Sequence, residues 1–103
     1  MAKVQILYWH DIPLQVRAGG RQQRVSRELP DRFQVAIDNA AMAAGLIGTD
    51  AYLDGFHWRE GEEREGSPTE VVAAVIAEIE NRYPIVDWQK TAKQLKSQDN
   101  QRP

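Results

Sequence analysis

Residues 3–10 read Lys-Val-Gln-Ile-Leu-Tyr-Trp-His, and these β-branched and aromatic side chains predict a β-strand. Residues 11–13, Asp-Ile-Pro, predict a turn, because proline has no N–H to give to a β-ladder and fixes its own φ. In residues 14–18 apolar Leu, Val and Ala alternate with Gln and Arg, which is the pattern of a second strand, and two glycines end it. We therefore expect the chain to begin with a β-hairpin.

Two helices are predicted from apolar periodicity and from signals at their ends. The first opens at Pro30-Asp31 and stops at Gly45, where a left-handed residue ends a helix. Its apolar stripe is Phe33, Ala36, Ile37, Ala40, Ala41 and Ala44. The second begins at Ser67-Pro68, with a capping serine and proline at the first helical position, and ends at Pro84. Its stripe is Val71, Val72, Val75, Ile76, Ile79 and Tyr83.

The remaining segments complete the predicted order. Residues 20–30 fit a loop or a short irregular strand, residues 51–59 a third strand and residues 60–66 a solvated loop, and Asp87 caps a final short helix. This order predicts an α+β fold: a small, mainly antiparallel three-stranded sheet (strand-strand-helix-strand-helix) with its helices on one face. We expect one α+β domain over residues 1–96 and a frayed polar tail over residues 97–103.

The composition bounds the class of protein. With 103 residues, 42% of them hydrophobic and 27% charged, the chain is long enough for one core. It contains no cysteine, which excludes disulfides, thiolate metal sites and a cysteine nucleophile. No apolar run reaches the ~20 residues of a membrane span and no secretory signal is visible, so a cytoplasmic protein is expected. A net charge of −2 offers nucleic acid no global attraction.

The first strand carries apolar groups on both of its faces, because side chains alternate along a strand. If helices cover one face only, large apolar side chains remain on the other. Two accounts of that second face are open: the C-terminal segment folds across it, or it meets a partner protein or a second copy of the chain. The predicted partner-binding residues are of the types found at binding hot spots, namely Tyr8, Trp9, Arg17, His57, Trp58 and Arg59.

The other candidate groups are two histidines and a cluster of arginines. His10 and His57 approach each other if their strands are neighbours, but no spacing is typical of a metal site, a cofactor or a catalytic pair, and none is predicted. Residues 17–32 hold five arginines against two carboxylates. This favours either a solvated segment or an anion-binding site formed by Arg21, Arg24 and Arg27. The segment has no aromatic residue, so nucleic-acid binding is the weakest hypothesis.

Four motifs are specific in combination: residues 8–16 (Tyr-Trp-His-Asp-Ile-Pro-Leu-Gln-Val), 29–33 (Leu-Pro-Asp-Arg-Phe), 36–42 (Ala-Ile-Asp-Asn-Ala-Ala-Met) and 48–53 (Gly-Thr-Asp-Ala-Tyr-Leu). Together they resemble the small bacterial virulence factor domain family. The resemblance implies an interaction or accessory module, since related domains in conserved virulence factor proteins are joined to a NifU-like domain and HEAT-type repeats. Stand-alone members accompany one-carbon and corrinoid methyl-transfer enzymes. The resemblance supplies no catalytic residues.

From the residues and the resemblance we expect a non-catalytic accessory or protein-interaction module. Its expected partner is another protein or a second copy of the chain, without a membrane. The alternative is a small anionic-ligand binder or minor enzyme linked to one-carbon or corrinoid methyl transfer, in which arginines hold the anionic group and a histidine handles the proton.

Overall fold

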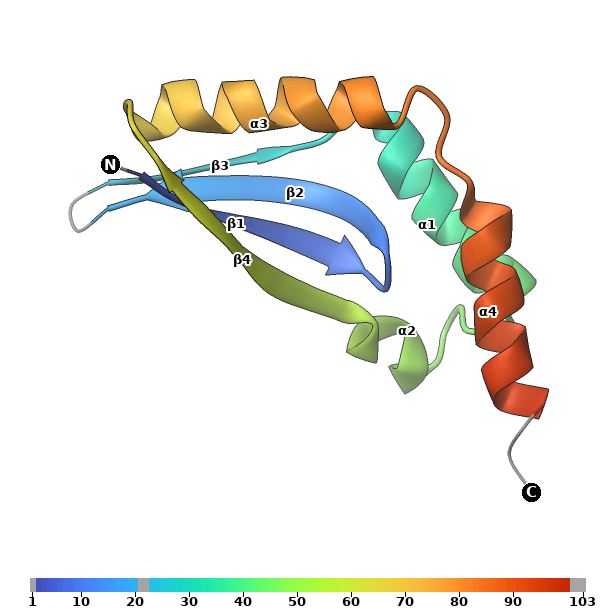
Figure 1. Cartoon of the computed structure of the whole chain (residues 1–103). Coiled ribbons are helices and arrows are strands. Elements are labelled where there is room, and N and C mark those ends of the chain that lie inside the picture. The colour runs from blue at the N-terminus through green and yellow to red at the C-terminus, as the bar shows by residue number, and fades with distance from the viewer. Residues whose placement is uncertain (1, 21–22, 101–103) are drawn as a thin grey trace.

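The computed structural model of the chain describes residues 2–20 and 23–100, with side chains up to residue 96. Four strands form one antiparallel sheet in the order β3-β2-β1-β4 (Figure 1). They are β1 (Ala2–Trp9), β2 (Ile12–Gly19), β3 (Arg24–Glu28) and β4 (Phe56–Arg64). The helices are α1 (Asp31–Ala43), α2 (Asp50–Asp54), α3 (Pro68–Arg82) and α4 (Trp88–Asn100). The α+β class is confirmed, and the expectation of a three-stranded sheet is wrong by one strand.

The predicted N-terminal hairpin is formed by β1 and β2. Ile6 pairs with Val16, and a bulge shifts the register between Leu7 and Tyr8. β3 is the additional strand, and it pairs with the other side of β2. Residues 24–28 can form it because an edge strand needs only one row of hydrogen bonds and leaves its polar side chains in solvent.

β4 begins later and runs further than the sequence predicts. Residues 50–54 form α2 instead of the start of a strand, and β4 continues through residues 60–64, which were predicted to be a loop. Glutamate has low β-propensity, but pairing along β1, from Tyr8 with His57 to Ala2 with Arg64, outweighs it. A second bulge lies around Gly61, where β4 has one residue more than β1.

The ends of α1 and α3 lie where local signals predict them. Gly45 has a φ of 74°, and the N–H of Leu46 donates to the carbonyl oxygen of Ala41 (2.8 Å), which is the C-terminal cap of α1. At the start of α3 the N–H of Glu70 donates to Oγ of Ser67 (3.2 Å). These contacts are local in sequence, so they were predictable without the fold.

The core lies between one face of the sheet and the helices. α3 runs across β1, β2 and β3, and α1 contacts β2, whereas α4 packs on α1 (Figure 1). The largest fully buried side chains include Trp9, Phe33 and Ile37, and the two predicted helical stripes are buried except for Ala44 and Tyr83, which are partly exposed. In the described part of the chain, no helix crosses the sheet face opposite α3. We call this surface the open face; it carries Lys3, Gln5, Leu7, Arg17, Trp58 and Glu60.

α4 begins at Trp88, and its cap is the predicted one, because the N–H of Lys90 donates to Oδ1 of Asp87 (3.2 Å). It continues through residues 97–100, which the composition predicts to be frayed; residues 101–103 lie outside the described residues. Among the described helices, none has the length and apolar character needed to cross a bilayer.

Candidate functional site

Trp9 is a predicted surface residue that the structure places in the core. Its side chain is 0% exposed, and its indole Nε1 donates a hydrogen bond to the carbonyl oxygen of Tyr52 (2.8 Å). The rings of His10 and Tyr52 lie 4.5 Å and 6.0 Å from it. The expectation that Trp9 lies on an exposed face is therefore wrong, because α2 folds back over this end of the sheet.

Arg17 and Trp58, two more of the predicted residues, lie on the open face. The guanidinium carbon of Arg17 is 3.8 Å from the centroid of the Trp58 ring, and its Nε donates to Oε1 of Gln5 (2.6 Å). Gln5 donates to Glu60 (3.2 Å), which also pairs with Nζ of Lys3 (2.7 Å). The open face therefore carries a row of polar side chains that bond one another, with the partly exposed indole of Trp58 beside them. It is not a broad apolar patch.

Tyr8, His57 and Arg59 lie on the other side of the sheet, toward α3 and α4. The rings of Tyr8 and His57 stack with centroids 6.2 Å apart, and the Arg59 guanidinium carbon lies 4.5 Å from the centroid of Tyr8. Nε of Arg59 also donates to Nε2 of His57 (3.2 Å). Burial and the neighbouring Tyr83 raise the pKa of Tyr8, and the charges of Arg59 and Arg82 oppose that rise. The six predicted residues are therefore divided between two faces and the core.

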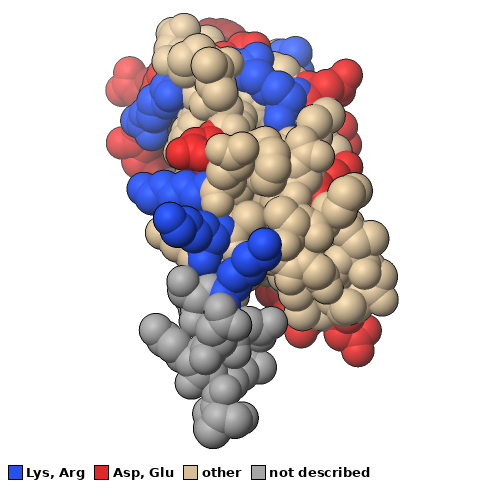
Figure 2. Space-filling model, turned by 90° about the vertical axis from the view of Figure 1, so that its right-hand side faces the viewer, with Lys and Arg blue, Asp and Glu red and all other residues tan. Residues whose placement is uncertain are grey.

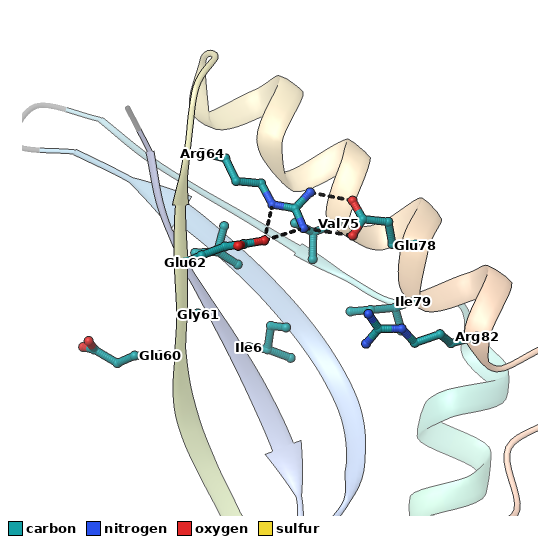
Figure 3. Close-up of a pocket in the computed structure, with 10 residues that line it drawn as sticks. Ile6, Glu60, Gly61, Glu62, Arg64, Val75, Glu78, Ile79 and Arg82 are labelled. Atoms are coloured by element: carbon teal, nitrogen blue, oxygen red, sulfur yellow. Dashed lines mark hydrogen bonds and ion pairs between the residues drawn. The ribbon is translucent and has the colours of Figure 1, made fainter.

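Two hollows follow one another along β4 on the side of the helices, and together we call them the β4 cleft. The larger, about 410 Å³, lies between β4 and α3 (Figure 3). Its floor is apolar and consists of Val4, Ile6, Val75 and Ile79. Its rim is charged and consists of Glu62, Arg64, Glu78 and Arg82; Glu60 also lines it, but its side chain points away from α3 (Figure 3). Gly61 keeps the hollow open, because it places no side chain between rim and floor.

Arg64 connects the two walls of this larger hollow. Its Nη2 donates to Oε1 of Glu78 on α3 (2.8 Å), and its Nε donates to Glu62 on β4 (3.2 Å). The hydrogen bonds and charge of this pair raise the pKa of Arg64 and lower the pKa of Glu78. The contact therefore holds the edge strand to the helix and sets the width of the hollow.

The smaller hollow, about 290 Å³, lies between the β1–β2 turn, β4 and α4. Both histidines line it, together with Asp11, Arg59, Thr91, Gln94 and Leu95. Thr91 is buried, and its Oγ1 donates to Oδ1 of Asp11 (2.6 Å). This bond ties the last helix to the hairpin turn and closes one end of the β4 cleft.

His10 occupies the turn with a φ of 55°, in the left-handed region. Its N–H donates to the carbonyl oxygen of Gly55 (3.0 Å), while its buried Nε2 has no hydrogen-bond partner within the described residues. Burial lowers the pKa of His10, and the charge of Asp11 acts in the opposite direction. His57 bonds Gly55 and Arg59, so neither histidine ring bonds a carboxylate. Across the described residues, no group of three or more His, Asp or Glu could hold a metal ion.

The predicted anion-binding arginines do not form one site. Arg24 lines a third hollow, about 100 Å³, on the open face beside Lys3 and Arg17. Arg27 is exposed, pairs with Val16 and does not line this hollow. Arg21 lies outside the described residues.

Sequence reasoning missed several residues of the β4 cleft, among them Arg64, Glu78 and Arg82. Glu78 and Arg82 lie four residues apart on α3 and flank the buried Ile79, so the helical period was a usable signal. Arg64 was assigned to a solvated loop, and no local signal placed it in a strand. Its role depends on the pairing of β4 with β1.

A further surface lies at the end of the molecule formed by α1 and α4. Figure 2 shows Lys and Arg side chains gathered beside a broad area that carries few charges. The exposed apolar side chains at this end and nearby are Val35, Met42, Ile47, Leu53 and Ile85. None of them lines one of the three hollows.

Comparison with known proteins places the chain in a family. Neither the curated proteins nor the solved structures gave a match. The family model described as "Virulence factor" matches residues 7–92, a range that includes the β1–β2 hairpin turn, α1, β4 and α3. Because this match spans most of the chain, the protein belongs to the virulence factor family.

Proposed function

We propose that the protein is a non-catalytic, cytoplasmic interaction module that holds an extended, acidic segment of a partner protein in the β4 cleft. The observation that carries this proposal is the larger hollow, which combines an apolar floor with a charged rim beside an edge strand. Sites that bind peptides and small molecules share this combination of apolar lining and a few oriented polar groups.

The floor supplies binding energy. Ile6 is partly exposed at the bottom of the larger hollow, next to the buried Val75 and Ile79. An apolar partner side chain that enters the hollow is removed from water, which favours binding by about 1.5–3 kcal/mol for a residue of the size of valine or leucine. One or two such anchors are typical of a docked segment.

Two arginines of the cleft favour a partner segment that carries acidic groups. Arg64 is already paired with Glu62 and Glu78. Arg59 and Arg82 make no ion pair within the described residues, and the charges of both act to lower the pKa of Tyr8, whose ring stacks on His57 of the smaller hollow. Two unpaired guanidinium groups beside a half-buried phenol attract carboxylates of the partner.

The contacts of the polar groups support binding rather than catalysis. Nε of Arg59 donates to Nε2 of the His57 ring, and Asp11 accepts a hydrogen bond from Thr91. Nε2 of His10 is buried, and no acid bonds it. General acid–base catalysis needs a proton-carrying group within hydrogen-bond reach of its partner, whereas the carboxylates of Asp11, Glu62 and Glu78 in this cleft are already bonded.

The test is selection of random peptides on the intact protein, followed by affinity measurements. We expect enriched peptides that carry Asp or Glu close to an apolar residue. Arg82→Glu weakens their binding about tenfold or more, because it places like charges opposite each other. Arg24→Glu is the matched control: it makes the same charge change on the opposite face and leaves the affinity unchanged.

Three results would contradict the proposal. The first is the absence of any enriched peptide, and the second is equal weakening by Arg24→Glu. The third is a concentration-dependent dimer, detected by light scattering, that the peptides dissociate, since the cleft would then be occupied by a second copy of the chain. Replacing the apolar residue of an enriched peptide by serine tests the floor without altering the protein.

A further inference from the structure

A third hollow lies on the open face, away from the β4 cleft, where β1 begins and β2 turns toward β3. It measures about 100 Å³, and its charged lining consists of Lys3, Arg17 and Arg24, without a carboxylate. Gly19 and Gly20 form its wall. This volume has room for about three water molecules, and therefore for one small polyatomic ion or group.

Arg17 is held in place before any ligand arrives. Its guanidinium carbon lies over the Trp58 ring, 3.8 Å from the centroid, and its Nε donates to Oε1 of Gln5 at 2.6 Å. Its two terminal NH₂ groups make no hydrogen bond with the described residues. Because Trp58 and Gln5 already restrict this side chain, Arg17 loses less side-chain entropy on binding an anion than a freely rotating arginine would.

The backbone at Gly19 and Arg24 shapes the other side of the hollow. A Cβ at Gly19 would lie 2.6 Å from the carbonyl oxygen of Gln23 and 3.0 Å from Cα of Arg24. Glycine at position 19 therefore permits β3 to approach β2 closely at the end where Arg24 lines the hollow together with Lys3 and Arg17. The side chain of Arg24 is exposed and forms no ion pair within the described residues.

The uncompensated positive charge of the third hollow indicates which class of ligand it binds. Lys3 is paired with Glu60 at 2.7 Å, so the two arginines carry the positive charge that remains uncompensated. Two cations in a hollow of this size match a doubly charged tetrahedral oxyanion better than a singly charged planar carboxylate. We propose that the hollow lined by Lys3, Arg17 and Arg24 binds a phosphate group, with the two arginines as its principal donors.

Titration of the labelled intact protein with inorganic phosphate, followed by amide NMR at constant ionic strength, tests this inference. We expect saturable shifts at Lys3, Gly19 and Arg24, and much weaker binding of acetate under the same conditions. Arg17→Gln weakens phosphate binding about tenfold or more, because a charged pair of donors is lost. Arg27→Gln, an exposed arginine on the same strand as Arg24 but outside the hollow, leaves it unchanged.

Two further variants make the result decisive. Arg17→Lys keeps the charge and removes the planar fork, so we expect an intermediate affinity. Glu60→Gln releases Lys3 and strengthens phosphate binding severalfold. Shifts that rise linearly without saturation, equal losses for Arg27→Gln and Arg17→Gln, or acetate binding as tight as phosphate would each overturn the proposal. The dispersion of the amide spectrum shows in every case that the variant is folded.

Discussion

Replacing Gly55 by alanine should destabilise the protein through Trp9. A Cβ at Gly55 would lie 2.6 Å from Nε1 of Trp9 and 2.8 Å from Nε2 of His10, closer than non-bonded atoms come. Gly55 has a φ of −74°, so the backbone itself accepts alanine and the whole cost is steric. The indole has to move, and this movement breaks its hydrogen bond to Tyr52.

The loss of stability caused by Gly55→Ala is the sum of two unfavourable contributions, reduced by one favourable contribution. Overpacking of a filled core costs about 1–3 kcal/mol, and a buried donor left without its acceptor costs about 1–3 kcal/mol more. The lower entropy of the unfolded alanine chain returns about 0.4–1 kcal/mol. We therefore expect Gly55→Ala to lower the free energy of unfolding by about 1–5.5 kcal/mol, a large part of the ~5–15 kcal/mol typical of a domain.

Urea denaturation followed by circular dichroism measures this loss, and near-ultraviolet dichroism reports whether the packing of Trp9 changes. Gly61→Ala is the matched control, because a Cβ there would lie 3.3 Å from the nearest atom, the carbonyl oxygen of Val4, and should cost less than about 1 kcal/mol. In a double-mutant cycle with Trp9→Phe, which removes Nε1, Gly55→Ala should cost at least about 1 kcal/mol less than in the wild type. A stability of Gly55→Ala within about 0.5 kcal/mol of the wild type, or strict additivity in the cycle, would refute the reasoning.

Three other perturbations test the fold and its charges. Ser67→Ala removes the oxygen that accepts from the first turn of α3 and should cost about 1 kcal/mol in urea denaturation; no measurable loss would contradict the cap. Arg64→Gln removes the cation that lowers the pKa of Glu78. In the wild type this ionised carboxylate stabilises the fold above pH 4.5 and the stabilisation is lost as the pH falls, so the variant should lose less stability on acidification. Melting temperatures that depend on pH as in the wild type would contradict this. Burial lowers the pKa of His10 below 6.5, so on acidification the unfolded chain binds a proton at His10 before the folded chain does. The free energy of unfolding should therefore fall as the pH drops below 6.5. His10→Asn removes the titrating group and tolerates the positive φ, so it should flatten this pH dependence of the denaturation midpoint.

The helices were predictable because their signals are local. Gly45 ends α1 and Ser67 begins α3 through hydrogen bonds between residues that are three to five positions apart, which the sequence shows directly. The apolar stripes follow the helical period, and their buried sides could be named before the fold was known.

The strands were less predictable, because partners distant in sequence decide them. The glutamate-rich residues 60–64 form a strand only because β1 lies beside them, and Arg64 thereby reaches Glu78 across the cleft. Alternation along β1 assigned side chains to faces. It contained no information on α2, which covers Trp9 and removes it from the surface.

The sequence by itself determined the α+β class, the N-terminal hairpin, the ends of α1 and α3 and the membership of a family, because each of these depends on residue types at short range. Only the tertiary structure decided which predicted surface residues share a face. It placed Tyr8, His57 and Arg59 on one face of the sheet and Arg17 and Trp58 on the other. It also formed the β4 cleft from strands and two helices that are far apart in the chain. The reason is physical: burial and long-range pairing depend on which segments meet, and an open side of a sheet exists only once the helices have packed against the other.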